Sequence, residues 1–141
     1  MRTISFIIIH CSAVRPTQTS SAREIDLWHR ARGWKQIGYH YVIRRDGTIE
    51  PGRREDQVGS HCKNHNAHSI GICYEGGLDV LGQPSDTRTP AQRTALRQLL
   101  TILKRRYPEA LIVGHNTLAR TTCPSFDAVT EYEDICTTDM S

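Results

Sequence analysis

The sequence lacks any concentration of charge of one sign. It has 18 Lys and Arg residues against 15 Asp and Glu residues, a formal net charge of +3, and the basic residues form no block. Proteins that track phosphate backbones normally carry such blocks. The composition therefore indicates a mild preference for anionic partners and does not indicate a nucleic acid.

Long apolar runs are also missing. The first run, from Ile4 to Ile9, is interrupted by Ser5. It is too short for the apolar core of a signal peptide, and no small-residue cleavage site follows it. No other stretch approaches membrane-spanning length. We therefore expect no membrane span and no signal peptide, and a protein made in the cytoplasm.

Cysteine is scarce. The five cysteines are an odd number and are irregularly spaced, which argues against a disulfide framework and indicates folding in a reducing compartment.

The chain shows no internal repeat and no linker. Its 141 residues, 38% hydrophobic and 23% charged, are enough to bury a core without cross-links. We expect one domain over residues 1–141.

The spacing of apolar residues predicts strands that alternate with helices. Apolar runs with β-branched residues predict strands, and capping boxes at Ser21 and Thr89 begin two amphipathic helices. We expect strands over residues 4–11, 39–44, 48–50, 69–75 and 110–115, and helices over 21–33, 89–107 and 125–133, before a frayed tail from Thr137. The predicted fold class is α/β (α+β), with a mixed β-sheet flanked by helices and a site at the strand ends.

Two of the expected strands end in a histidine. His10 closes the run FIIIH, His115 closes ALIVGH, and Cys123 follows in the next loop. Two imidazoles and one thiolate supply three zinc ligands and leave a fourth position for water, as in catalytic zinc sites. Taken singly, each of these residues is more often structural. Cys11 alternates with His10 along the strand and is expected to face the core.

Other polar and aromatic residues allow two interpretations. His61, His65 and His68 share a polar loop, which we expect to line a groove and to hydrogen-bond a polar ligand. His29 belongs to the periodic set of a helix, which favours a structural histidine. Tyr39 opens a strand, where the pattern favours an amphipathic aromatic at a strand edge, although its hydroxyl can face a pocket.

Taken together, these segments resemble the zinc-dependent N-acetylmuramoyl-L-alanine amidases, which include the amidase-type phage lysozymes (endolysins) and the related peptidoglycan recognition proteins. The matching segments follow the family's order from about residue 6 to residue 127: FIIIHCSA, REIDLWHRARGW, IGYHYVIRRDGTIEPGR, VGSH, HSIGIC, TPAQ and CPSFD. The resemblance implies a mixed sheet flanked by helices, with His10, His115 and Cys123 as the zinc ligands.

The activity implied by the resemblance is hydrolysis of the amide between N-acetylmuramic acid and L-alanine in peptidoglycan by a zinc-activated water. Tyr39 matches the family's active-site tyrosine, and His61 and Asn66 match positions that line the substrate groove. The phage lysozymes carry a catalytic lysine two residues before the cysteine ligand, where this chain has Thr121, as some amidase-active recognition proteins do. Tyr39 and Thr121 then offer neutral hydroxyls to the tetrahedral oxyanion. No glutamate is placed as in an HExxH motif, so the general base is unassigned.

The expected partners are peptidoglycan and its muropeptides, with no nucleic acid or membrane partner, and the chain is expected to be a monomer. It would act on the cell wall after release or export by a route other than a signal peptide. Two other functions stay open. One is a muropeptide-binding module without catalysis, against which the three ligands and Tyr39 argue. The other is a cysteine hydrolase with Cys123 as nucleophile and His115 as base, which removal of metal would distinguish.

Overall fold

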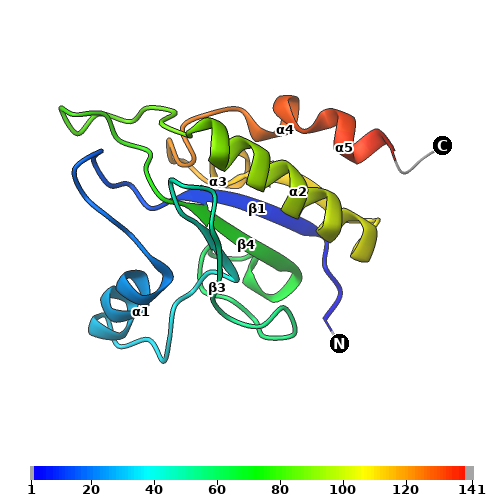
Figure 1. The fold of residues 1–141 in the computed structure, drawn as a ribbon. Helices are drawn as coiled ribbons and strands as arrows, with labels where there is room; N and C mark the ends of the chain where they lie inside the picture. Colours follow the sequence, from blue (N-terminus) through cyan, green and yellow to red (C-terminus); the bar gives the residue numbers. More distant parts are fainter. Residues whose placement is uncertain (1, 139–141) are drawn as a thin grey trace.

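The computed structural model describes residues 2–138 and contains a five-stranded mixed sheet (Figure 1). The strands lie in the order β3-β2-β4-β1-β5. Strand β1 is parallel to β4 and β5, β2 is parallel to β4, and β3 returns antiparallel to β2. The bounds are β1 Phe6–Cys11, β2 Tyr41–Ile43, β3 Ile49–Pro51, β4 Ser69–Tyr74 and β5 Leu111–Gly114. The predicted mixed α/β fold is confirmed.

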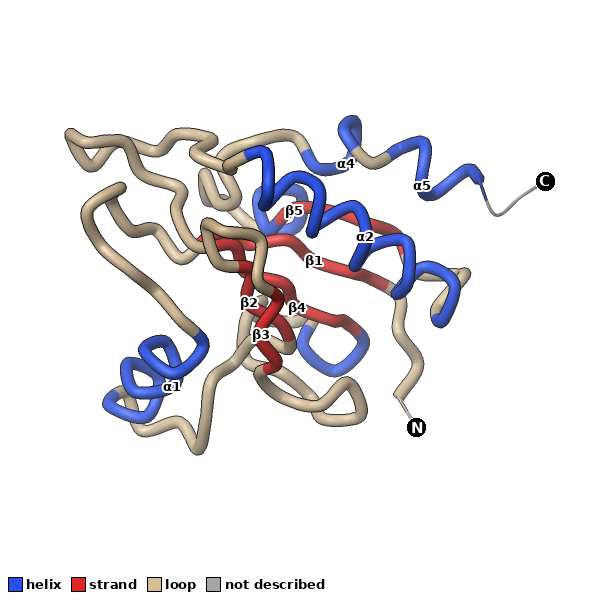
Figure 2. Tube along the Cα trace, in the orientation of Figure 1, coloured by secondary structure: helices blue, strands red, loops and turns tan. Residues whose placement is uncertain are grey.

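Helices cover both faces of the sheet (Figure 2). The long helix α2 lies on one face together with α4 and α5, and α1 lies on the opposite side. The bounds are α1 Ala22–Ala31, the 3₁₀ helix η1 Asn66–His68, α2 Pro90–Arg106, α3 His115–Leu118, α4 Ala128–Glu131 and α5 Glu133–Thr138. Within residues 2–138, none of these helices has the length and apolar character needed to cross a membrane.

The larger core lies between the sheet and α2. The Thr89 side chain accepts a hydrogen bond from the Gln92 N–H and so caps α2, with Pro90 in its first turn. The buried residues of this core include Ile7, Ile9, Cys11, Ile70, Ile72, Tyr74, Leu96, Leu100 and Leu103. Because side chains alternate along a strand, the odd-numbered residues of β1 face α2 and the even-numbered ones face away. The predicted burial of Cys11 in the core is confirmed.

The opposite face of the sheet carries two small apolar clusters. Ile25 of α1 packs with Val42 and Cys73 in one of them. Ile8 packs with Cys62 and Val113 in the other. The even-numbered His10, near the carboxyl end of β1, also lies on this face of the sheet.

Two expected strand boundaries are shifted. Tyr39 lies before β2, which begins at Tyr41, because the chain bends there and the Tyr39 carbonyl accepts a hydrogen bond from the Arg53 N–H. Strand β5 ends at Gly114, and His115 is the first residue of the short helix α3. The Thr117 hydroxyl accepts a hydrogen bond from the Gly114 N–H and stabilises this helix start.

The expected C-terminal helix is divided into α4 and α5 at Tyr132. The Tyr132 side chain is buried, and its hydroxyl accepts a hydrogen bond from the Arg88 guanidinium. Helix α5 extends to Thr138, one residue beyond the start of the tail that is predicted to be frayed. Residues 139–141 of that tail lie outside the described residues.

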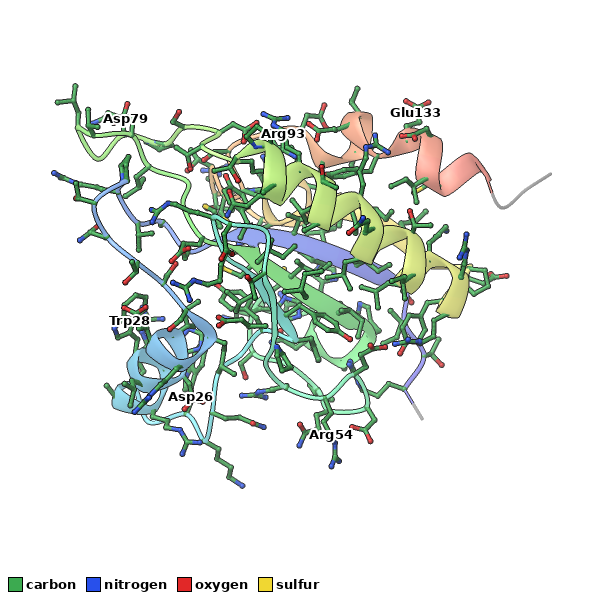
Figure 3. All side chains as sticks on the ribbon, viewed as in Figure 1. Asp26, Trp28, Arg54, Asp79, Arg93 and Glu133 are labelled. Carbon is green, nitrogen blue, oxygen red and sulfur yellow. The ribbon has the colours of Figure 1, made fainter. Side chains whose placement is uncertain are left out.

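Charged side chains of both signs lie on several different segments of the fold. Figure 3 labels Asp26, Arg54, Asp79, Arg93 and Glu133, which lie at the periphery on different segments and carry both signs. This distribution agrees with the absence of a basic block in the sequence. The five cysteines are free thiols in the structure.

Candidate active site

Strand β1 brings His10 to the sheet face that α2 leaves uncovered. His10 pairs with Cys73 of β4 in the strand register and is 1% exposed. Its ring centroid lies 4.6 Å from that of His115. One possible ligand atom from each of His10, His115 and Cys123 lies within 4.8 Å of the other two. The three residues predicted as metal ligands are therefore brought together.

The parallel pairing of β1 with β5 explains how His115 reaches this position. Ile9 pairs with Gly114, so the residue that follows β5 lies beside the carboxyl end of β1. A side chain at Gly114 would not fit, because a Cβ there would lie 2.5 Å from the Asn116 Oδ1 and 2.9 Å from the Pro124 Cδ. Glycine thus permits the close packing that turns the chain at His115 towards the site.

The loop after α3 returns Cys123 to the same point. The Asn116 N–H donates to the Cys123 carbonyl at 2.8 Å, and the Tyr74 hydroxyl donates to the Pro124 carbonyl at 2.6 Å. These bonds fix the loop against β4 and α3. The Cys123 Sγ accepts a hydrogen bond from the Cys11 N–H at 3.1 Å, which directs the sulfur towards the end of β1.

The chemistry of this donor set fits zinc. Burial lowers the pKa of His10 well below its ordinary value, and burial also lowers the pKa of His115. Both imidazoles are therefore neutral at pH 7, which is the form that binds metals. Two imidazole nitrogens and one sulfur match a three-ligand zinc site with an open fourth position.

The same environment argues against Cys123 as an unassisted nucleophile. The hydrogen-bonded thiol of Cys11, together with burial, raises the pKa of Cys123 above its ordinary value. A thiol protonated at neutral pH is a poor nucleophile, because the thiolate is the reactive species. A bound cation reverses this preference and deprotonates a coordinating thiol. The site therefore favours Cys123 as a ligand.

His61 contacts the ligand set directly. Its Nδ1 lies 2.8 Å from the His10 Nε2, and its Nε2 lies 3.2 Å from the Ser69 Oγ. Burial, followed by the nearby His40, lowers the pKa of His61 to about 3, so this ring is also neutral. The sequence placed His61 in a groove but gave no sign of its contact with His10, since the two residues are distant in the chain.

A cleft of about 520 Å³ opens beside His115. It is lined by His29, Arg32, Trp34, Tyr39, Ser60, His61, Cys62, Lys63, Asn66 and His115. His61 and Asn66, the two predicted substrate-binding residues, are both on this lining. The Asn66 Oδ1 accepts hydrogen bonds from the N–H groups of His61 and Cys62 at 2.8 and 2.9 Å. Asn66 therefore also shapes the loop that carries His61.

Tyr39 lies against the ligand set on the lining of the same cleft. Its ring centroid is 5.1 Å from that of His10 and 5.7 Å from that of His29. Burial raises the pKa of Tyr39 well above its ordinary value. Its hydroxyl is therefore neutral at pH 7 and able to donate a hydrogen bond.

Thr121 lies in the ligand loop and is exposed. Its Oγ1 accepts a hydrogen bond from the Cys123 N–H at 3.3 Å. This bond uses one lone pair of the hydroxyl and leaves its proton available. Thr121 thus supports the loop that carries Cys123, and it is not among the residues that line the cleft.

The remaining histidines have other surroundings. The His65 Nδ1 lies 3.3 Å from the His68 Nε2, and both rings pack on Phe6. Neither residue lines the cleft. His29 is 7% exposed, and its Nδ1 accepts a hydrogen bond from the Gly38 N–H at 2.9 Å. This contact agrees with the predicted structural role, but the position of His29 and Trp34 on the cleft wall was not foreseen.

The fold and the site define a class of protein that includes solved amidases and peptidoglycan recognition proteins. The structure is similar to N-acetylmuramoyl-L-alanine amidase LysC from Clostridium intestinale URNW, with a TM-score of 0.78 and 32% identity over 99% of this chain and 86% of that one. It is also similar to human PGRP-IβC, solved in complex with glycosamyl muramyl pentapeptide, with a TM-score of 0.76 and 25% identity over 94% of this chain and 84% of that one.

Sequence comparison narrows the class to one family. The chain is 50% identical over 123 residues to the endolysin of Klebsiella phage KP32. The matched region covers 87% of this chain and 82% of that protein. Residues 1–126 match the family described as N-acetylmuramoyl-L-alanine amidase. The chain belongs to the N-acetylmuramoyl-L-alanine amidase family, and the predicted resemblance is confirmed.

Proposed function

We propose that this chain is a zinc-dependent amidase that hydrolyses the bond between N-acetylmuramic acid and L-alanine in peptidoglycan. The observation that carries the proposal is the convergence of one ligand atom each from His10, His115 and Cys123 to within 4.8 Å, beside a cleft that His115 itself lines. Residues 1–141 act as one catalytic domain in this proposal.

His10, His115 and Cys123 would hold the zinc ion, which when bound supplies Lewis-acid polarisation of a carbonyl and activation of a water. The protein's own contribution begins with the cleft, whose lining includes the cations Arg32 and Lys63. These positive charges suit a muropeptide, whose stem peptide carries carboxylates. Asn66 holds the loop that forms one wall.

Tyr39 is the proposed hydrogen-bond donor to the tetrahedral oxyanion. Its hydroxyl is neutral and its ring lies against His10. One well-placed donor of this kind contributes about 3–4 kcal/mol to transition-state stabilisation. Thr121 offers a second hydroxyl from the Cys123 loop. Among the described residues that line the cleft, none is Asp or Glu, so no carboxylate in this lining is available as general base.

Metal analysis combined with digestion of purified muropeptide tests the proposal. We expect zinc in the purified protein, release of free stem peptide detected by mass spectrometry, loss of this activity on chelation, and its recovery on addition of zinc. Activity that survives chelation and is abolished by a thiol alkylating agent would instead identify a cysteine hydrolase. Muropeptide binding without product would identify a binding module.

The similarity to a phage endolysin supports a role in cell-wall degradation. We propose that the protein acts on the wall after release or export, as a monomer with peptidoglycan as its partner. Size-exclusion chromatography with light scattering should give the mass of one chain, 16.0 kDa. A dimer mass would contradict the proposed monomer without affecting the proposed chemistry.

A further inference from the structure

A buried hydrogen-bonded chain connects the sheet to one of the candidate metal ligands. It runs from the His10 Nε2 to the His61 Nδ1 at 2.8 Å, and from the His61 Nε2 to the Ser69 Oγ at 3.2 Å. Ser69 is the first residue of β4 and is 0% exposed. It therefore has no access to a substrate in the cleft.

The His61 ring also packs closely against two glycines. A Cβ at Gly71 would lie 2.6 Å from the His61 Cγ, and a Cβ at Gly59 would lie 2.8 Å from the His61 Cδ2. Both distances are shorter than any normal carbon contact, so the ring occupies space that only glycine leaves free. In this position its two nitrogens face His10 and Ser69.

The proton positions follow from the requirement that His10 bind a cation. A neutral imidazole carries a single N–H. Because the His10 Nε2 is engaged with His61, the nitrogen left for a metal is Nδ1, which must be unprotonated. His10 then carries its proton on Nε2 and donates it to the His61 Nδ1. His61 in turn carries its proton on Nε2 and donates it to the Ser69 Oγ.

We propose that His61 and Ser69 are positioning residues that hold His10 in its metal-binding tautomer, an inference that rests on the proposed zinc function. Both nitrogens of His61 are engaged in hydrogen bonds with His10 and Ser69, so His61 acts on the reaction through His10. This differs from a role in which His61 hydrogen-bonds the substrate. Partners that accept the second N–H of a metal-bound histidine typically affect metal affinity by about 10–100-fold.

Four variants test the hydrogen-bonded connection from His10 through His61 to Ser69. His61→Ala removes the acceptor for His10, and we expect the zinc dissociation constant to rise by about 10–100-fold. His61→Asn places an amide oxygen near the position of the Nδ1, and we expect it to restore affinity to within about threefold of wild type. Ser69→Ala should weaken zinc binding by about 10-fold. Ser20→Ala is the matched control. Ser20 is also 0% exposed, but its hydroxyl donates a hydrogen bond to the Ser12 hydroxyl and takes no part in the contacts of His10, His61 and Ser69.

The measurements are zinc affinity by competition with a chromophoric chelator and ¹⁵N NMR of histidine in the zinc-loaded protein. The spectra should show His10 and His61 both as Nε2–H tautomers. Thermal unfolding of each variant shows whether it is folded, and His61→Asn against His61→Ala tests the inference even if Ser69→Ala is unstable.

Two outcomes would contradict different claims. If the wild-type chain binds zinc but His61→Ala and Ser69→Ala bind it equally well, or if His61 is an Nδ1–H tautomer, the positioning role is wrong and the proposed amidase stands. If the wild-type chain binds no zinc and its activity is independent of metal, the proposed function fails, and this inference fails with it.

Discussion

Replacing Cys123 by serine is the most direct test of the site. The substitution removes the sulfur from the candidate ligand set and leaves a neutral hydroxyl, which is a poor ligand compared with a thiolate. The Cys123 Sγ also accepts the Cys11 N–H at 3.1 Å, so the shorter serine side chain cannot fill the same position.

The expected loss can be worked from typical zinc energetics. Sites with four ligands bind zinc with about 10–16 kcal/mol, so one ligand contributes roughly 2.5–4 kcal/mol. Since 1.4 kcal/mol corresponds to a tenfold change, the dissociation constant should rise by about 100-fold or more. At a zinc concentration of about 100 times the wild-type dissociation constant, zinc stabilises the wild type by about 2.7 kcal/mol. The same concentration stabilises the Cys123→Ser variant by only about 0.4 kcal/mol.

Thermal unfolding with and without zinc measures this difference. For a chain of 141 residues, these energies correspond to a zinc-induced rise in Tm of about 10 °C for wild type and about 1–2 °C for Cys123→Ser. Cys136→Ser is the control, because Cys136 is a half-buried free thiol in α5 and should leave the zinc-induced rise unchanged. A full rise in Tm together with full activity in Cys123→Ser would refute the ligand assignment.

Four further predictions follow from the site and its surroundings. Thr121→Val should lower kcat, measured at saturating zinc because the change also removes the acceptor for the Cys123 N–H, by about 10-fold, and wild-type turnover would show that the hydroxyl has no catalytic role. Tyr39→Phe should lower kcat by about 100-fold; a change confined to KM would contradict its role as oxyanion donor. Asn66→Ala removes the acceptor for two backbone N–H groups, so KM should rise with zinc stoichiometry unchanged at saturating zinc, and an unchanged KM would contradict a role of Asn66 in shaping the substrate cleft. Burial raises the pKa of Glu55, but hydrogen bonds from one arginine and two tyrosines outweigh it and hold this pKa below its ordinary value. The resulting stability is present above the ordinary pKa and is lost as pH falls through the lowered one, so Tm should fall more steeply below about pH 4 in wild type than in Glu55→Gln.

The sequence by itself determined the elements and the identity of the candidate ligands. Capping boxes at Ser21 and Thr89 predicted the starts of α1 and α2, and both caps are present. Such signals are local, because a cap involves residues within one turn of each other. His10, His115 and Cys123 were also identifiable from the sequence, since apolar runs that end in histidine deliver side chains to the edge of a sheet.

Only the tertiary structure decided how these residues are connected. The contact between His10 and His61 depends on the pairing of β1 with β4 and on the space above Gly71. Strand register and loop packing set such contacts, and no periodicity in either segment encodes them. The same reason explains why the hydrogen bond from the Cys11 N–H to the Cys123 Sγ was not predicted. The sequence pattern is sufficient to identify the imidazoles and the thiol of the site. Long-range packing determines the distances between these groups and decides which of them donates and which accepts each hydrogen bond.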